Sequence, residues 1–198
     1  MTRESGPAVV ALAGSNGAGK STTGPVLLRD TLGITEFVNA DVIAQGLSAF
    51  NPEGASIAAG RVMLARLHEL ADRRVDFGFE TTLAGRAYAG WIKELRRRGY
   101  TFHLIYLWLR DVDLAIKRVR KRVDLGGHDV SEQTIRRRYR AGLVNFFGIY
   151  RSLAKTWRFY DNSFEGGPLL IAEGTGSKVR TIRDRDTWLT VSRELKNK

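Results

Sequence analysis

Residues 14–22, Gly-Ser-Asn-Gly-Ala-Gly-Lys-Ser-Thr, constrain this chain most, because they fit the phosphate-binding pattern G-x-x-x-x-G-K-[ST]. The apolar run 8–13 predicts a buried strand before this P-loop, and residues 21–30 predict a helix after it. In that setting backbone N–H groups cradle phosphate oxygens, Lys20 brings a positive charge, and the Ser21 hydroxyl can ligate Mg²⁺. The N-terminus of the helix adds its own partial positive charge. We therefore predict an ATP and Mg²⁺ site made of Gly14, Asn16, Gly17, Ala18, Gly19, Lys20, Ser21 and Thr22.

Apolar strand-like runs alternate with longer amphipathic stretches along the chain, which is typical of a parallel sheet covered by helices on both faces. The expected strands are 9–13, 37–39, 75–80, 102–109, 157–160 and 169–172. The expected helices are 20–32, 57–73, 87–98, 112–123, 131–147 and 186–195. Within 57–73 the helical period predicts one buried stripe, formed by Val62, Leu64, Leu67 and Leu70. The chain has 198 residues and no internal repeat, so we predict one α/β domain over 1–198, a three-layer α/β/α fold with a mostly parallel sheet of five or six strands.

The net charge of the chain indicates which classes of ligand it can bind. It carries 32 Lys and Arg against 21 Asp and Glu, a formal net charge of +11. This excess suits an acidic ligand such as a nucleotide, a sugar nucleotide or a nucleic acid. Most of it lies in three predicted helical clusters, at 96–98, 117–122 and 136–140. A nucleic-acid-binding or polynucleotide end-processing protein is therefore the alternative function, but it is less favoured, because no aromatic platform is interleaved with the basic residues.

Cysteine content and hydropathy exclude several other classes. There are no cysteines, which excludes disulfides and zinc sites built on cysteine. The apolar run near the N-terminus is too short for a signal peptide, and no segment is long enough to span a bilayer. We therefore expect a cytoplasmic protein with no membrane partner.

Polar residues follow two of the predicted strands, at the sheet edge where ligands of open α/β sheets bind. Asn39 and Asp41 follow the second strand, and Glu80 with Thr82 closes the third. Asp41 could take the proton of an acceptor hydroxyl as a general base, or it could only cap a helix over 42–46. Glu80 could hold Mg²⁺ through water or accept hydrogen bonds from substrate hydroxyls, and both interpretations stay open.

A helical lid is predicted over about 118–140. Arg118 and Arg122 lie four residues apart on one helical face, a glycine-rich break follows at 124–129, and the next helix carries Arg136, Arg137 and Arg138. Two arginine-bearing helices joined by such a turn are typical of P-loop kinase-like folds, in which the lid excludes water from the reaction. Arg138 borders the apolar stripe of its helix whereas Arg137 points outward, so Arg138 is the preferred catalytic arginine. Asn162 lies in a segment, 160–163, that could pack on the adenine.

Together these motifs resemble the zeta-toxin-like kinases, and more narrowly the bacterial zeta-toxin family. The matching segments follow in order through nearly the whole chain: 14–22, 37–41, 58–61, 79–86, 106–109, 122–123, 126–130, 135–139 and 160–163. The resemblance implies a P-loop kinase fold and phosphorylation, by ATP and Mg²⁺, of a hydroxyl on a sugar nucleotide, which in zeta toxins is UDP-N-acetylglucosamine. It also allows an antitoxin partner, which no residue of this chain identifies.

The resemblance also implies roles for individual residues. Asp41 matches the base, Lys20 and Ser21 match the ATP and magnesium residues, and Glu80 and Thr82 match acceptor-binding positions. In the family pattern an arginine follows the strand-end threonine, but Ala84 stands there and Arg86 is the next arginine along. The expected catalytic residues are Asp41, Lys20, Arg122 and Arg138. Arg118 and Asn162 join the P-loop at the nucleotide, and the expected acceptor-binding residues are Asn39, Glu80, Thr82, Arg86 and Arg137.

Overall fold

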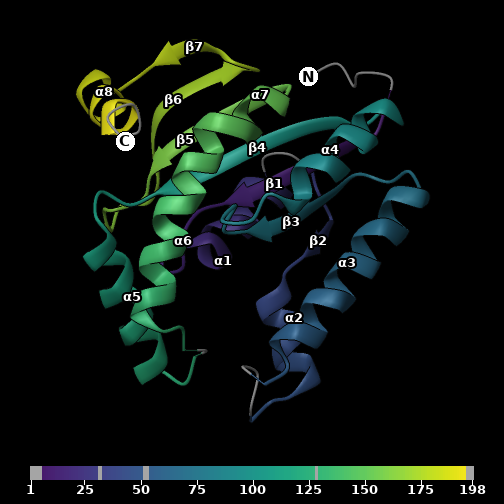
Figure 1. Cartoon of the computed structure of the whole chain (residues 1–198), viewed down its shortest axis with the longest axis horizontal. Helices are drawn as coiled ribbons and strands as arrows, with labels where there is room; N and C mark the ends of the chain where they lie inside the picture. The colour runs from purple at the N-terminus through teal and green to yellow at the C-terminus, as the bar shows by residue number, and fades with distance from the viewer. Residues whose placement is uncertain (1–5, 31–32, 51–53, 128, 195–198) are drawn as a thin grey trace.

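The computed structural model describes residues 6–30, 33–50, 54–127 and 129–194, and seven strands of this part form one sheet (Figure 1). The strand order is β2-β3-β1-β4-β5-β6-β7. All pairings among β1 to β5 are parallel, whereas β6 and β7 are added antiparallel. The strands are β1 (Ala8–Ala13), β2 (Glu36–Val38), β3 (Phe77–Thr81), β4 (Thr101–Trp108), β5 (Thr156–Asp161), β6 (Leu169–Thr175) and β7 (Lys178–Ile182).

Helices cover both faces of this sheet, which confirms the three-layer α/β/α architecture. Two of them continue into π-helical segments, named η1 and η2. The elements are α1 (Lys20–Gly24), η1 (Pro25–Asp30), α2 (Ala40–Leu47), α3 (Ser56–Asp72), α4 (Ala87–Arg97), α5 (Val112–Asp124), α6 (Glu132–Asn145), η2 (Phe146–Tyr150), α7 (Arg151–Leu153) and α8 (Arg185–Glu194). None of the described helices has the length and apolar character needed to cross a membrane.

The central strand β1 separates two hydrophobic cores. Side chains alternate between the faces of a strand, so Val9 and Ala11 join one core while Val10 and Leu12 join the other. The first core is rich in aromatic residues and takes side chains from α3, α4, η2 and α8. The second lies beside the P-loop and takes side chains from η1 and α5. The P-loop thus leaves the best-buried strand of the sheet, which gives the loop a rigid base.

The buried stripe of α3 differs from the predicted one. Val62 and Leu64 are 45% and 46% exposed, whereas Met63, Leu67 and Leu70 are buried. Met63 has the right spacing to share a helical face with Leu67 and Leu70, because residues three and four apart lie on the same side. The prediction was wrong at Val62 and Leu64, which are apolar but lie on the side of α3 that faces solvent.

One strand is additional to the prediction, and two predicted helices change in detail. The strand β7 was not expected, because its sequence Lys-Val-Arg-Thr-Ile has no continuous apolar run and lies at the sheet edge. The helix predicted at 20–32 turns from α to π at Pro25, which has no N–H for the α-helical ladder, and residues 31–32 lie outside the described part. The helix predicted at 131–147 is α6, capped by the Ser131 hydroxyl and continued by η2.

Two helical pairs project from the sheet on either side of α1 (Figure 1). One pair is α2 with α3, and the other is α5 with α6, the segment predicted to form a lid. The loops that begin these pairs follow the carboxyl ends of β2 and β4. This arrangement puts the P-loop between two groups of side chains that come from distant parts of the sequence.

Candidate functional site

The P-loop joins β1 to α1 in a conformation that requires glycine. Gly14, Gly17 and Gly19 all have a positive φ, the left-handed region that suits residues without a Cβ. A Cβ on Gly14 would lie 2.3 Å from the carbonyl oxygen of Leu107, so the loop lies directly against β4. Because the backbone approaches its neighbours this closely, the loop has a defined shape before any ligand binds.

Asn162 and Arg118 support this loop from its far side. The Asn162 amide Nδ2 donates to the carbonyl oxygen of Ala18 at 2.8 Å. Arg118 on α5 donates from Nη1 to the Asn162 carbonyl at 2.7 Å and from Nη2 to the Ser163 carbonyl at 3.2 Å. The structure therefore places Asn162 directly against the P-loop, whereas Arg118 contacts the segment after β5 that carries Asn162.

Lys20 is buried at the start of α1, with 6% of its surface exposed. Its ammonium Nζ donates to the Ser15 carbonyl at 2.9 Å and lies 3.5 Å from Oε1 of Glu80. Burial lowers the pKa of Lys20, and the negative charges of Glu80 and Asp41 oppose that shift. The positive charge of Arg122 lowers the same pKa further, so Arg122 also acts on this site.

Glu80 joins the P-loop to α2. Its Oε2 accepts from the Ser21 hydroxyl at 3.1 Å and from Nδ2 of Asn39 at 2.8 Å. Asn39 in turn caps α2, since its Oδ1 accepts from the backbone N–H of Asp41 at 2.8 Å. The alternative that Asp41 only caps a helix is therefore wrong: Asn39 is the cap, and Asp41 lies in the first turn. Its carboxylate acts electrostatically on Lys20 and Arg138.

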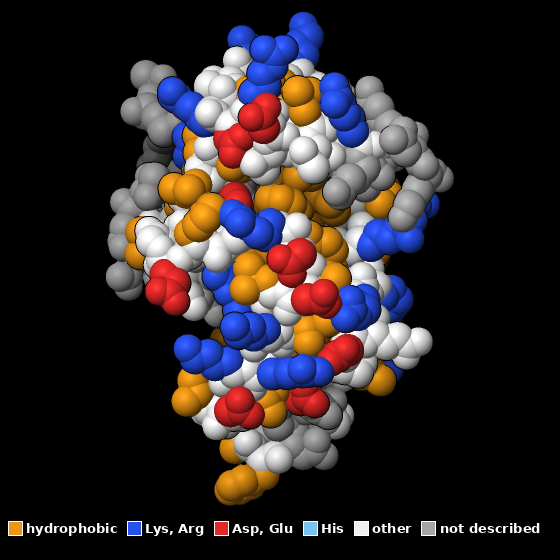
Figure 2. All heavy atoms as spheres, turned by 90° about the vertical axis from the view of Figure 1, so that its left-hand side faces the viewer, with side chains coloured by type: hydrophobic (Ala, Val, Ile, Leu, Met, Phe, Trp, Pro, Cys, Tyr) orange, Lys and Arg blue, Asp and Glu red, His pale blue; other side chains and the backbone are white. Residues whose placement is uncertain are grey.

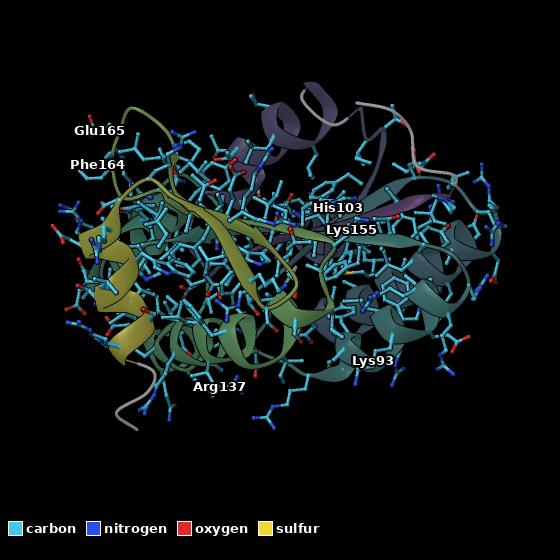
Figure 3. The ribbon with its side chains drawn as sticks, turned by 90° about the horizontal axis from the view of Figure 1, so that it is seen from above. Lys93, His103, Arg137, Lys155, Phe164 and Glu165 are labelled. Carbon is cyan, nitrogen blue, oxygen red and sulfur yellow. The ribbon has the colours of Figure 1, made fainter. Side chains whose placement is uncertain are left out.

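The three arginines predicted on the second lid helix, α6, have different surroundings. Arg138 on α6 donates from Nη1 to Oδ1 of Asn16 in the P-loop at 3.2 Å, and burial lowers its pKa while Asp41 opposes the shift. Arg136 pairs with Asp113 at 2.7 Å on the surface. Arg137 is exposed and lies on the outer side of the ribbon in Figure 3. The structure thus brings Arg138 to the phosphate loop and leaves Arg136 and Arg137 outside it.

The remaining acceptor candidates lie in the loop that follows β3. The Thr82 hydroxyl oxygen accepts from the backbone N–H of Ala84 at 3.4 Å, and Arg86 is exposed just before α4. Two residues that contact this loop were missed from the sequence: Asn145 and Tyr150 donate to its backbone carbonyls. Asn145 had a signal, since it is a lone polar residue in the apolar stretch 143–147.

The oxygen ligands of this site fit a magnesium ion bound together with a nucleotide. The described residues contain no group of three or more His, Cys, Asp or Glu side chains suited to a metal. The Ser21 hydroxyl and the Glu80 carboxylate nevertheless lie 3.1 Å apart beside the phosphate loop. Mg²⁺ prefers oxygen ligands and is commonly held by one or two protein groups plus substrate phosphates, so this pair suits it. His128, which belongs to the predicted lid turn, lies outside the described residues.

The basic clusters do not form a uniformly positive surface. Figure 2, which views the side of α5 and α6, shows Lys and Arg interspersed with Asp and Glu. Arg120 pairs with Glu132 across these two helices, and Arg136 pairs with both Asp113 and Glu132. Within these two clusters, the charges of Arg120 and Arg136 are therefore matched by neighbouring carboxylates.

Comparisons with known proteins identify a family that most of this chain matches. The family model described as Zeta toxin matches residues 1–162. A Haemophilus influenzae protein, described as uncharacterized, is 32% identical over 126 residues, which are 64% of this chain and 88% of that protein.

Solved structures share the fold. The AvrRxo1-ORF1:AvrRxo1-ORF2 complex with sulphate ions has a TM-score of 0.74 and 15% identity, and the match covers 94% of this chain and 64% of that chain. The same complex has also been solved with ATP, with a TM-score of 0.68 and 16% identity over the same shares of both chains. A structure of the PezAT toxin–antitoxin system of Streptococcus pneumoniae has a TM-score of 0.63 and 13% identity, over 99% of this chain and 88% of that chain. The chain thus spans less than two thirds of the AvrRxo1 chain that it matches.

Proposed function

The chain belongs to the zeta-toxin family of P-loop kinases, and from that premise we propose that it transfers the γ-phosphate of ATP to a hydroxyl of a sugar nucleotide resembling UDP-N-acetylglucosamine. One observation carries the proposal. The carboxylate of Asp41 is not used as the helix cap and lies within electrostatic reach of both Lys20 and Arg138. A base beside two cations at a phosphate loop is the arrangement that phosphoryl transfer to a hydroxyl needs.

In this mechanism the P-loop backbone and Lys20 hold the β- and γ-phosphates of ATP. Asp41 orients the acceptor hydroxyl and takes its proton as the new O–P bond forms and the bond between the γ-phosphorus and the bridging oxygen breaks, releasing ADP. Such a base is worth about 10²–10⁴ in rate. Arg138 and Arg122 neutralise charge that develops on the transferred group, and an arginine in this role is worth up to about 10³–10⁵.

Mg²⁺ would be held by the Ser21 hydroxyl and the Glu80 carboxylate, and it would offset the negative charge of the phosphates. In the described structure Glu80 already contacts Lys20 and Ser21, so it orients both side chains for the nucleotide. Asn39 acts through Glu80 and through the cap of α2. Asn39 is therefore proposed to position Glu80 and α2, and not primarily to contact the acceptor.

The acceptor is proposed to bind against the loop after β3, which carries Thr82 and Arg86. Thr82 offers a hydroxyl, and Arg86 offers an exposed guanidinium that suits the diphosphate of a sugar nucleotide. The α5–α6 pair, with Arg138 at the P-loop and Arg118 at the segment after β5, serves as the lid. Arg137 is exposed on its outer side, so it is the weakest of the acceptor candidates.

The test is ADP release with ATP and Mg²⁺ across UDP-sugars, nucleosides and short oligonucleotides. We expect UDP-N-acetylglucosamine to stimulate release, and Asp41→Ala to lower turnover by about 10²–10⁴ without unfolding the protein. Lys20→Ala should abolish transfer. Asp72→Ala serves as the matched control, because Asp72 is an exposed carboxylate paired with Arg98 at the end of α3.

Each other outcome of the panel contradicts part of the proposal. Stimulation by oligonucleotides alone would transfer the assignment to polynucleotide end processing, with binding that weakens steeply as salt rises. Stimulation by a nucleoside alone would remove the sugar nucleotide but keep the kinase. Turnover near the wild-type value in Asp41→Ala would show that Asp41 is not the base.

A further inference from the structure

One continuous helical element holds the loop after β3 by its backbone. The carbonyl oxygens of Leu83 and Ala84 accept from Nδ2 of Asn145 at 2.8 and 3.1 Å. The carbonyl oxygen of Gly85 accepts from the Tyr150 hydroxyl at 2.8 Å. The preceding carbonyl, of Thr82, faces Gly142 so closely that a Cβ there would lie 2.3 Å from its oxygen. Four consecutive carbonyls of the loop therefore face α6 and η2.

The same loop is also fixed from within. The Thr81 and Thr82 hydroxyl oxygens accept from the backbone N–H groups of Leu83 and Ala84 at 3.0 and 3.4 Å. Leu83 has a φ of +53° and a side chain that is 1% exposed. A leucine in the left-handed region costs about 1–2 kcal/mol, so such a conformation persists only where its surroundings hold it. Asn145, which is itself 4% exposed, supplies two of the hydrogen bonds that do so.

The change from α- to π-helix explains how two residues of one helix reach this loop. Asn145 and Tyr150 are five residues apart, a spacing that places side chains about 140° apart around an α-helix. The segment η2 begins directly after Asn145 and ends at Tyr150. A π-helical turn bonds residues five apart, so it returns Tyr150 to the side of the helix that Asn145 occupies. Burial raises the pKa of Tyr150 to about 12, so its hydroxyl remains a donor near neutral pH.

The other half of this helix reaches the phosphate loop. Arg138 of α6 contacts Asn16, and Ile135 is buried in the core beside the P-loop. Further along, Leu143 and Phe146 are buried in the core on the opposite face of the sheet. The helix therefore touches the P-loop at one end and the loop after β3 at the other, and it is anchored in both cores.

We propose that α6 and η2 act as a positioning element that sets the loop after β3 at a fixed place relative to the P-loop, with Asn145 and Tyr150 as positioning residues. The proposal rests on the proposed function, in which this loop receives the acceptor. Neither residue contacts the reacting groups. They act through the backbone of 82–85, and so determine where the Thr82 hydroxyl and the Arg86 guanidinium stand when the phosphate is transferred.

The first test does not depend on the acceptor. Amide hydrogen exchange of a peptide spanning 81–87 is followed by mass spectrometry in the wild type, Asn145→Ala and Tyr150→Phe. Each lost hydrogen bond should speed exchange of this peptide about five-fold, which corresponds to about 1 kcal/mol. Tyr100→Phe is the matched control, because the Tyr100 hydroxyl also donates to backbone carbonyls but at Leu70 and Val75. Unchanged exchange in both variants, or equal acceleration in Tyr100→Phe, would overturn the proposal.

The second test separates positioning from general stability. With UDP-N-acetylglucosamine as acceptor, Tyr150→Phe and Asn145→Ala should lower kcat/KM for the acceptor about ten-fold or more, while the Kd of a fluorescent ATP analogue changes less than two-fold. Equal losses for both ligands, or full acceptor kinetics despite faster exchange, would contradict the positioning role. A wild-type enzyme that ignores this acceptor would refute the proposed substrate instead, and the exchange experiment would still decide whether the loop is held as described.

Discussion

At the scale of single residues, the site places a buried cation among carboxylates before any phosphate arrives. Lys20 is nearly inaccessible, yet Glu80 lies 3.5 Å from its ammonium and Asp41 adds a second negative charge nearby. Removing a charge from water is costly unless it is paired and hydrogen-bonded. Glu80 and the Ser15 carbonyl therefore hold Lys20 until a nucleotide replaces part of this environment.

The burial of Lys20 predicts a defined pH dependence of stability. Folding lowers the pKa of Lys20 below 10.5. At pH values between the pKa in the folded protein and 10.5, the unfolded chain therefore binds more protons than the folded one. The contribution of Lys20 to stability therefore rises with pH through that window and is smallest below it. We expect the unfolding free energy of the wild type, relative to Lys20→Met, to increase in urea titrations as the pH is raised toward 10.5. Lys93→Met, at an exposed lysine of α4 (Figure 3), is the control, and a difference independent of pH would contradict the assignment.

Substitution by alanine should have opposite effects on the unfolding free energy at Gly19 and at Gly90. A Cβ on Gly19 would lie 2.5 Å from Nδ2 of Asn162, which is committed to the Ala18 carbonyl, and φ is +81°. Gly19→Ala should therefore lower the unfolding free energy by about 1–3 kcal/mol and abolish nucleotide binding. Gly90, within α4, has open space around it, so Gly90→Ala should raise stability by about 0.5–1 kcal/mol and leave binding unchanged. Denaturant titration and a fluorescent ATP analogue measure both, and wild-type ATP affinity in Gly19→Ala would refute the account of the loop.

At the scale of elements, hydrophobic periodicity predicted which helices and strands exist more accurately than it predicted where each one begins and ends. The six expected strands are all present, and the central strands β1 and β4 bury most of their apolar runs in the sheet. The seventh, β7, could not be found from burial, since four of its five residues are exposed and only pairing with β6 defines it. The π-helical segments could not be predicted from the sequence either. Their pitch depends on the contacts that the helix makes, such as those of Asn145 and Tyr150.

The cap of α8 is an element-scale feature with its own prediction. Asp184 accepts from the Thr187 backbone N–H at 3.0 Å and from the Thr187 hydroxyl at 2.7 Å, and these bonds lower its pKa below 3.8. The stabilisation that Asp184 contributes is therefore fully present at pH values above its pKa in the unfolded chain. It is lost as the pH falls through its pKa in the folded protein. At pH 7, Asp184→Ala should cost about 0.5–2 kcal/mol, or a fall in Tm of about 2–4 °C per kcal/mol.

The measurement for this cap is thermal unfolding of the variant and the wild type at neutral and acid pH. The control is Asp186→Ala, which removes an exposed carboxylate from the first turn of the same helix and should cost less. Because α8 buries Trp188 and Val191 in the aromatic core, loss of the cap should be felt by the whole domain. Equal Tm losses in the two variants would argue against the cap.

At the scale of the whole molecule, the sequence predicted the half of the site that depends on local pattern. The P-loop, Asp41, Glu80 and Arg138 follow from motif, strand ends and helical period, and the fold places them side by side. The contacts that hold the surrounding loops could not be predicted, because they are long-range: Asn162 to Ala18 and Asn145 to Leu83 each join residues more than sixty positions apart. Such contacts depend on strand order, which no local pattern encodes.

The two outer strands of the sheet have a consequence for how copies of this protein behave toward one another. An open sheet can polymerise by adding a strand from a second molecule to an unpaired rim. Here one rim is β2, which has three residues, and the other is β7, which carries Lys178 and Arg180 on an exposed strand. A short edge strand and a charged edge strand both disfavour pairing with a strand of another molecule. Part of the positive charge that first suggested a polyanionic partner therefore protects the folded protein from aggregation through its own backbone.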